Sequence, residues 1–215
     1  KLPIVGKLFG KLFGTKTTIT GQGVYAEDTK LNDVMLSGIE SGYYVDVNKK
    51  KSFAGFTYSN KNSTNKTIDD QLSKQFTLII KNFFDVIKSA APVLGFTTDQ
   101  IDSNLKDFVV KIGKIDLKGL SGKEIQEKLN AVFGAAGDDM AKAALPGFEK
   151  FQQVGEGYLE TVVRVAYATE SLRGMMDTLG VSTALTVDTA MGLVDTFGDL
   201  EIAMDKLGAY YDAFY

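Results

Sequence analysis

The spacing of apolar residues changes along this 215-residue chain, and the change limits the folds it can adopt. Before residue 66, β-branched and aromatic residues alternate with polar ones in several short stretches. Such alternation is typical of half-buried strands. After residue 67, apolar residues recur every three or four positions, as in amphipathic helices. The chain is therefore predicted to be α+β, with a small antiparallel sheet and helices followed by an all-helical part.

The first half is predicted to contain strands, one short helix and a hairpin. In chain order, we expect a strand at 17–20, a helix at 31–39, a hairpin of 43–47 and 53–58, and a strand at 110–117. The first strand is expected to end in a turn at Gly21, and the charged segment 48–52 to form the hairpin loop. Residues 59–66 are all polar and predict an exposed loop. This succession is compatible with a βαββαβ, ferredoxin-like order.

Helix starts are marked by caps. The predicted caps and their partners are Thr67 with Asp70, Thr97 with Gln100, and Ser121 with Glu124. The first of these helices is expected to end near Pro92 and the third to run towards Phe133. Pro146 is predicted to be the first residue of a further long helix, since proline is favoured at that position.

The last segment has apolar residues at alternating intervals of four and three, which predicts a heptad seam. This candidate interaction surface consists of Leu193, Phe197, Leu200, Met204, Leu207, Tyr211 and Phe214. Gly192, Gly198 and Gly208 weaken the repeat and favour an intramolecular helix hairpin over a free coiled coil. The pattern continues to Tyr215 without a stop signal, so the chain is expected to be a fragment of a longer protein.

Three parts are expected: an apolar, glycine-rich arm at 1–14, an α+β domain at 15–118 and a helical domain at 119–215. In the arm, Gly6, Gly10 and Gly14 form a stripe on a helix, and lysines alternate with apolar residues. Such a stretch suits close helix packing or contact with a membrane surface. A flexible arm is the alternative.

The chain contains neither histidine nor cysteine. It therefore lacks Ser–His pairs, thiolate nucleophiles, disulfides and imidazole or thiolate metal ligands. The pair Asp138–Asp139 has no further oxygen ligands at suitable spacing and predicts a solvated helix face. We expect no enzymatic activity, no cofactor and no metal site.

Charge is distributed unevenly, although the net charge is only −3. Residues 1–66 hold ten lysines and five acids, whereas residues 146–215 hold two lysines, two arginines and eleven acids. Solvated faces explain such a distribution, and so do different partners at the two ends. The lysines are dispersed and not interleaved with aromatic residues, so sequence-specific nucleic-acid binding is not expected.

The stretch 21–26 matches the G-x-G-x-x-A dinucleotide fingerprint. The fingerprint requires a buried strand before it and a helix N-terminus after it. Here the preceding strand is polar, and Glu27 and Asp28 would repel phosphate. A tight turn is the better interpretation.

Glu40-Ser-Gly-Tyr43 resembles the Glu-Ser-Gly-aromatic motif of lytic transglycosylases, in which the glutamate is the general acid and base. In that family a Gly-Ala-x-Gly-Leu-Met-Gln segment follows closely. The nearest counterpart here, at 134–140, lies far downstream and lacks the glutamine. Lys49, Lys50 and Lys51 also predict a solvated neighbourhood rather than a closed cleft.

Three stretches together resemble tail tape measure proteins of long-tailed bacteriophages and prophages. They are the glycine-rich lead into a Lys-Thr-Thr strand at 10–18, the hairpin sequence at 43–56, and the segment 145–166. The matches are family-level patterns and include no catalytic set.

The resemblance implies a structural virion protein that is assembled in the bacterial cytoplasm and located in the tail. Family members set tail length, contact tail-tip and tail-tube proteins, and are ejected before the DNA. Self-association and a transient contact with the host membrane are compatible with this role. The alternatives are a peptidoglycan lytic transglycosylase that uses Glu40 and a membrane-active ejection segment at 1–14.

Overall fold

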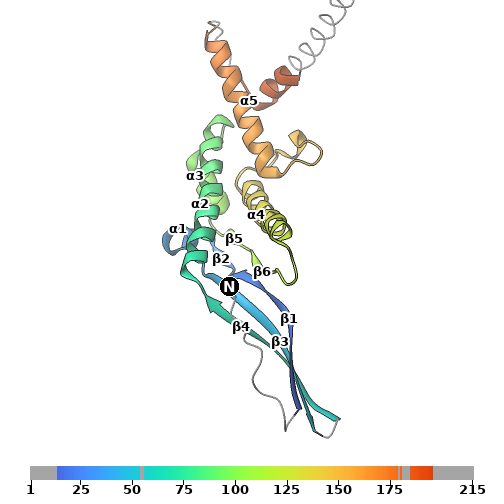
Figure 1. Cartoon of the computed structure of the whole chain (residues 1–215). Helices are drawn as coiled ribbons and strands as arrows, with labels where there is room; N and C mark the ends of the chain where they lie inside the picture. Colours follow the sequence, from blue (N-terminus) through green and yellow to red (C-terminus); the bar gives the residue numbers. More distant parts are fainter. Residues whose placement is uncertain (1–13, 54–55, 179, 181–184, 196–215) are drawn as a thin grey trace, which may run out of the picture. The chain divides into compact units, whose positions relative to one another are not determined.

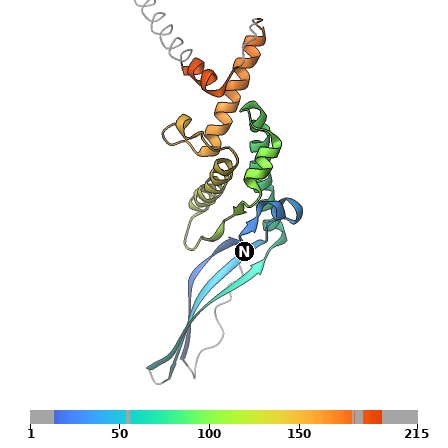
Figure 2. The same cartoon turned by 180° about the vertical axis from the view of Figure 1, so that it is seen from behind.

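The computed structural model describes residues 14–53, 56–178, 180 and 185–195. The chain is α+β, as predicted (Figures 1 and 2). In chain order, its elements are β1 (Gly14–Ala26), β2 (Thr29–Lys30), α1 (Leu31–Ser37), β3 (Ser41–Phe53), β4 (Phe56–Ile68), α2 (Asp70–Val93), α3 (Thr98–Leu105), β5 (Val109–Val110), β6 (Gly113–Asp116), α4 (Gly122–Ala144), the 3₁₀ helix η1 (Glu149–Phe151) and α5 (Tyr158–Thr178). Residues 187–195 are also helical.

The chain divides into two compact units, and each unit is discontinuous in sequence. The first joins the residues up to Ile79 with Val109–Phe133, and the second joins Ile80–Phe108 with the residues from Gly134 onward. The division falls within α2 and α4. The domain boundary expected after residue 118 stays a prediction.

The larger sheet lies in the first unit and has the strand order β4-β3-β1-β6. All its strand pairs are antiparallel, and β1 and β3 pair from Gly14 opposite Ser52 to Ala26 opposite Ser41. The succession β1-α1-β3-β4-α2-β6 follows the expected βαββαβ order, but the ferredoxin-like arrangement is wrong. In that arrangement a helix crosses between parallel strands, whereas β1 and β3 are antiparallel neighbours.

One face of this sheet is apolar near its base. Residues directly opposite each other in antiparallel strands share a face, and Val24 lies opposite both Tyr43 and Ile115. Val24 and Ile115 are buried, as is Val47 farther along β3. Elsewhere in this unit, the rings of Phe76 and Phe133 meet edge to face with centroids 4.7 Å apart. These contacts belong to the core of the first unit.

A hairpin is present, formed by β3 and β4, but the predicted pairing is wrong: residues 43–47 pair with 63–67 and not with 53–58. The expected loops at 48–52 and 59–66 are wrong, since both segments are β-strand. The expected turn at Gly21 is also wrong, because β1 continues to Ala26 with a shift of register between Ile19 and Gly21. The polar residues stay extended because their main-chain groups pair with a neighbouring strand while their side chains remain solvated.

The strand expected at 110–117 is divided in two. Val109–Val110 forms β5 and pairs with β2 at Thr29–Lys30, whereas Gly113–Asp116 forms β6 and pairs with β1. Gly113 has a φ of 64°, which only glycine adopts readily, and the backbone changes direction at this residue. The alternating stretch that was predicted to be one strand is therefore divided between two sheets.

The helix starts are partly as predicted. The short helix α1 and the capping boxes at Thr97 and Ser121 are confirmed. The cap at Thr67 is wrong, because Thr67 lies in β4 and Asp69 caps α2 by accepting a hydrogen bond of 2.7 Å from the Leu72 amide. Asp69 is the first residue after β4 that is free to take the cap position.

The long helix expected from Pro146 is also wrong. The chain between α4 and α5 contains only the short helix η1, and α5 begins at Tyr158. Gly147 and Gly155 have φ values of 96° and 82°, which an α-helix does not contain. The buried Tyr158 hydroxyl holds this connection by donating to the Leu145 carbonyl at 2.6 Å.

Candidate functional site

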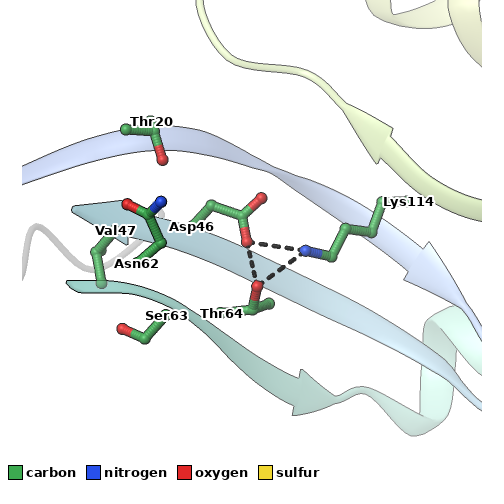
Figure 3. A pocket seen from close by; sticks show the side chains of 7 residues that line it. All are labelled: Thr20, Asp46, Val47, Asn62, Ser63, Thr64 and Lys114. Carbon is green, nitrogen blue, oxygen red and sulfur yellow. Dashed lines mark hydrogen bonds and ion pairs between the residues drawn. The ribbon is translucent and has the colours of Figure 1, made fainter.

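A polar cluster that joins three strands lies on the other face of the large sheet (Figure 3). Lys114 of β6 donates to Asp46 of β3 at 2.8 Å and to Thr64 of β4 at 3.0 Å. Thr64 also donates to Asp46. These hydrogen bonds, first that of Lys114 and then that of Thr64, hold the pKa of Asp46 below its ordinary value. The cluster thus contains a satisfied ion pair.

Two glycines of β1 lie on the face of the sheet that Lys114 crosses. Gly21 lies opposite Asp46 and Gly23 lies opposite Asp116, so both glycines belong to the polar face. A Cβ atom on Gly23 would lie 1.9 Å from the Ile115 carbonyl oxygen, so only glycine fits there. The Gly-x-Gly pair that matches the dinucleotide fingerprint is therefore part of a strand, where Gly23 permits the close approach of the β6 backbone.

A second ion pair neutralises the neighbouring part of this face. Lys66 of β4 pairs with Glu27, and its Nζ lies 4.4 Å from the centroid of the Tyr25 ring. Lys114 lies in the same way over Tyr44, at 4.8 Å. Both tyrosines are buried, and this burial raises the pKa of each phenol. The inner half of the polar face is therefore balanced in charge.

The outer half of the sheet is different. Segments 14–26 and 47–68 contain no aspartate or glutamate. They carry a group of exposed lysines, which we call the lysine arm: Lys16, Lys49, Lys50, Lys51 and Lys61. None of these lysines forms an ion pair with a residue that the structure describes. The arm is a solvated cationic surface on long paired strands, visible as β1, β3 and β4 in Figure 1.

A shallow hollow of about 360 Å³ adjoins the cluster. Its lining comes from β1, β3, β4 and β6 and consists of Thr20, Asp46, Val47, Asn62, Ser63, Thr64 and Lys114. The carboxylate and the ammonium in this lining bind each other (Figure 3). Such an arrangement can order the strands and offer hydrogen bonds, but it presents no activated nucleophile or general acid.

Glu40, the candidate general acid, is exposed between α1 and β3. The adjacent Ser41 is buried, and its amide donates to the Ser73 hydroxyl at 3.0 Å. The hydrogen bond between Ser41 and Ser73 forms part of the junction between β3 and α2. The geometry around Glu40 is that of a surface loop rather than a cleft.

Asp138 and Asp139 have different surroundings, although both lie on α4. Asp138 accepts a hydrogen bond of 2.8 Å from the Leu159 amide in the first turn of α5. Asp139 is exposed. Among the described residues, no group of three or more acidic side chains is placed to hold a metal ion. Asp138 therefore acts as an anionic cap for a helix N-terminus.

The two interaction surfaces expected from the sequence lie almost wholly outside the described residues. Of the heptad seam, Leu193 belongs to the helical stretch 187–195, and the positions from Phe197 to Phe214 are not described. Of the arm 1–14, only Gly14 is described, as the start of β1. In the described part of the chain, no helix is long and apolar enough to cross a membrane.

Sequence reasoning missed both the lysine arm and the cluster around Asp46. The arm had a usable signal, because a run of more than 20 residues with several lysines and no acid is visible in the sequence. The cluster had none, since Asp46 and Lys114 are 68 positions apart and meet only through sheet pairing. No protein-family model, curated protein or solved structure matches this chain. Its function is therefore inferred from its own residues.

Proposed function

We propose that this chain is a structural segment of a phage or prophage tail tape measure protein that acts through surface contacts and not through catalysis. The three stretches at 10–18, 43–56 and 145–166 support the family assignment. The observation that carries the mode of action is the lysine arm, which displays charge on extended strands instead of in a closed cavity. In the virion tail, the segment would contact tail-tip and tail-tube proteins.

Two of the three stretches coincide with structured parts that suit a scaffold. The second, at 43–56, covers most of β3, which pairs with β1 on one side and β4 on the other. A strand paired on both sides is held along its whole length by main-chain hydrogen bonds. The hairpin is therefore a stable projection on which side chains can be displayed.

The third stretch, at 145–166, contains a tightly bonded charge pair. Arg164 donates to the two carboxylate oxygens of Glu156 at 2.7 and 3.0 Å, and also to the Phe151 carbonyl at 2.6 Å. A paired planar guanidinium and carboxylate of this kind fix direction as well as distance. This pair anchors an irregular connection to the surface of α5 and gives it a defined shape.

The transglycosylase alternative has weaker support. Acid catalysis of glycoside cleavage uses a carboxylic acid with a raised pKa and usually a second carboxylate across the scissile bond. Glu40 is exposed on the surface between α1 and β3. Surface recognition therefore accounts for more of the described features than glycoside hydrolysis does.

The assignment to the tail is tested by locating the chain in purified particles. Peptides from residues 14–195 are quantified by mass spectrometry in intact virions and in ghosts that have released their DNA. We expect the peptides in virions and a marked depletion in ghosts, because family members are ejected. A major capsid peptide serves as the loading control. Absence of the chain from intact virions would contradict the proposal.

The mode of action is tested by a separate assay. Peptidoglycan turnover is measured with the wild-type chain and with Glu40→Gln. Neither protein is expected to release muropeptides above the buffer control. Release by the wild type that disappears in Glu40→Gln would establish the enzymatic alternative, whatever the particle experiment shows.

A further inference from the structure

We infer that one face of the lysine arm binds the phosphate backbone of double-stranded nucleic acid without reading its sequence. The face is formed by Lys49 and Lys51 of β3 and Lys61 of β4, which we call the lysine triad. The inference goes beyond the proposed tail function, because it concerns which partner the outer sheet contacts.

Strand register places the triad on one face. Lys49 lies directly opposite Lys61, and Lys51 lies two residues farther along β3, where side chains return to the same side. Two residues of extended strand span about 7 Å. Successive phosphates of one DNA strand rise about 3.4 Å along the helix axis and also turn around it, so that neighbouring phosphates lie about 7 Å apart. The triad thus matches the spacing of neighbouring phosphates.

The side chains around the triad are also of the kind that binds phosphate. Thr17 of β1 lies opposite Lys49, Ser59 lies opposite Lys51, and Ser63 follows Lys61 by two residues on the same face. Hydroxyls and ammonium groups are common donors to phosphate oxygens in protein–DNA complexes. Among the described neighbours on this face, Ile19 is the one large apolar side chain that is exposed, and a single such residue is too small an apolar surface to anchor the sheet in a bilayer. Nucleic acid is therefore favoured over a lipid surface.

The triad destabilises the sheet of the isolated protein by charge repulsion. Lys49 and Lys61 are like charges directly opposite each other in an antiparallel pair, and Lys16 and Lys50 repeat the arrangement on the other face. Such pairs destabilise a sheet, and no acid in segments 14–26 or 47–68 compensates them. A polyanionic partner would remove this repulsion, which gives the arrangement a physical reason.

The rest of the chain directs where a polyanion can bind. The net charge is −3. The lysine arm contributes +5, because it has five lysines and no acid, so the remaining residues carry −8. Outside the lysine arm the chain holds 19 basic residues (24 minus the five of the arm) and 27 acidic ones, so a duplex is attracted more strongly at the lysine arm than by the average of the remaining residues. Charge asymmetry of this kind orients an encounter even when the net charge is negative.

Binding is tested with the intact chain and a fluorescently labelled duplex of mixed sequence, by anisotropy between 50 and 200 mM salt. Three phosphate contacts predict a slope of about −2.7 for log K against log salt, hence roughly 40-fold weaker binding over this range. The variant Lys49→Gln/Lys51→Gln/Lys61→Gln is expected to lose this salt-dependent binding. The variant Lys49→Arg/Lys51→Arg/Lys61→Arg is expected to retain it, which shows that charge at these positions is sufficient.

A control with the same change in net charge is Lys74→Gln/Lys106→Gln/Lys128→Gln, whose lysines are exposed outside the arm. It is expected to bind like the wild type. Equal losses in both glutamine variants would overturn the inference, because they would show a general charge effect. No binding by the wild type, or binding to phosphatidylserine vesicles but not to the duplex, would also overturn it. Circular dichroism checks that each variant is folded. If the triple glutamine variant is not folded, the single variants Lys49→Gln and Lys61→Gln decide the matter, because each is expected to weaken binding and an unchanged affinity in both would overturn the inference.

Discussion

Replacing Glu156 with glutamine is expected to loosen the connection between α4 and α5. The Glu156 carboxylate accepts two hydrogen bonds from Arg164, one from Thr161 at 2.8 Å and one from the Gln153 amide at 3.0 Å. These bonds, with that of Arg164 as the largest cause, lower the pKa of Glu156 from 4.5 to about 2. Glutamine keeps the shape of the side chain but removes the charge and one acceptor.

The size of the effect follows from the pKa. A shift from 4.5 to about 2 corresponds to about 3 kcal/mol of folding free energy at neutral pH. Glu156 is 9% exposed but Arg164 is 30% exposed, so solvent screens part of the interaction. We expect Glu156→Gln to lower the free energy of unfolding by about 2 kcal/mol at pH 7.

The pH dependence has a defined sign. The folded-state pKa of Glu156 is depressed, so its contribution is complete above pH 4.5 and is lost as the pH falls from 4.5 towards 2. The stability difference between the wild type and Glu156→Gln is therefore expected to be full at pH 7 and smaller at pH 3. Using the difference between the two proteins cancels the titration of the other acids.

The assay is urea unfolding followed by circular dichroism, at pH 7, 4.5 and 3. With a slope of about 2 kcal/mol per molar urea, a loss of about 2 kcal/mol moves the midpoint down by about 1 M. The control is Glu170→Gln, because Glu170 lies 3.9 Å from Arg173 and is 66% exposed. That variant is expected to stay within about 0.5 kcal/mol of the wild type. Equal midpoints for the two variants at pH 7, or a difference that does not change with pH, would refute the reasoning.

Three further predictions concern stability and are measured by the same unfolding assay. Gly23→Ala is expected to lower the free energy of unfolding by more than about 2 kcal/mol, because the new Cβ would lie 1.9 Å from a β6 carbonyl oxygen. Its control, Gly174→Ala, has open space around the new Cβ and is expected to stabilise α5 by about 0.5–1 kcal/mol. Tyr158→Phe is expected to lower the free energy of unfolding by about 1–3 kcal/mol, because the buried Phe148 amide loses its hydrogen-bond acceptor at 3.1 Å. An unchanged stability would show that water replaces the hydroxyl. Thr97→Ala removes one half of a capping box and is expected to cost about 1 kcal/mol, and an unchanged midpoint would mean that α3 does not depend on its cap.

Local signals in the sequence predicted those features that depend on residues near one another in the chain. The capping boxes at Thr97 and Ser121 join groups three residues apart, so their residue types and spacing are sufficient to predict them. The short helix expected at 31–39 was found for the same reason, and it spans 31–37. The prediction at Thr67 failed because a competing long-range interaction, the pairing of β4 with β3, occupies that residue.

The candidate site could not be predicted in this way, because its residues are far apart in the chain. Its ion pair joins Asp46 to Lys114 only because sheet pairing places β1 between β3 and β6. No local pattern indicates this order of strands. The lysines were visible as a composition, but register alone places Lys49, Lys51 and Lys61 on one face.

By itself, the sequence determined the α+β class, most helix starts and the absence of imidazole and thiol chemistry. Only the tertiary structure decided that the polar segments 48–52 and 59–66 are strands and that their lysines share a surface. The physical reason is the range of the stabilising interaction. A cap or an amphipathic stripe is satisfied within a few residues, whereas a polar strand is extended only when another strand satisfies its main-chain hydrogen bonds.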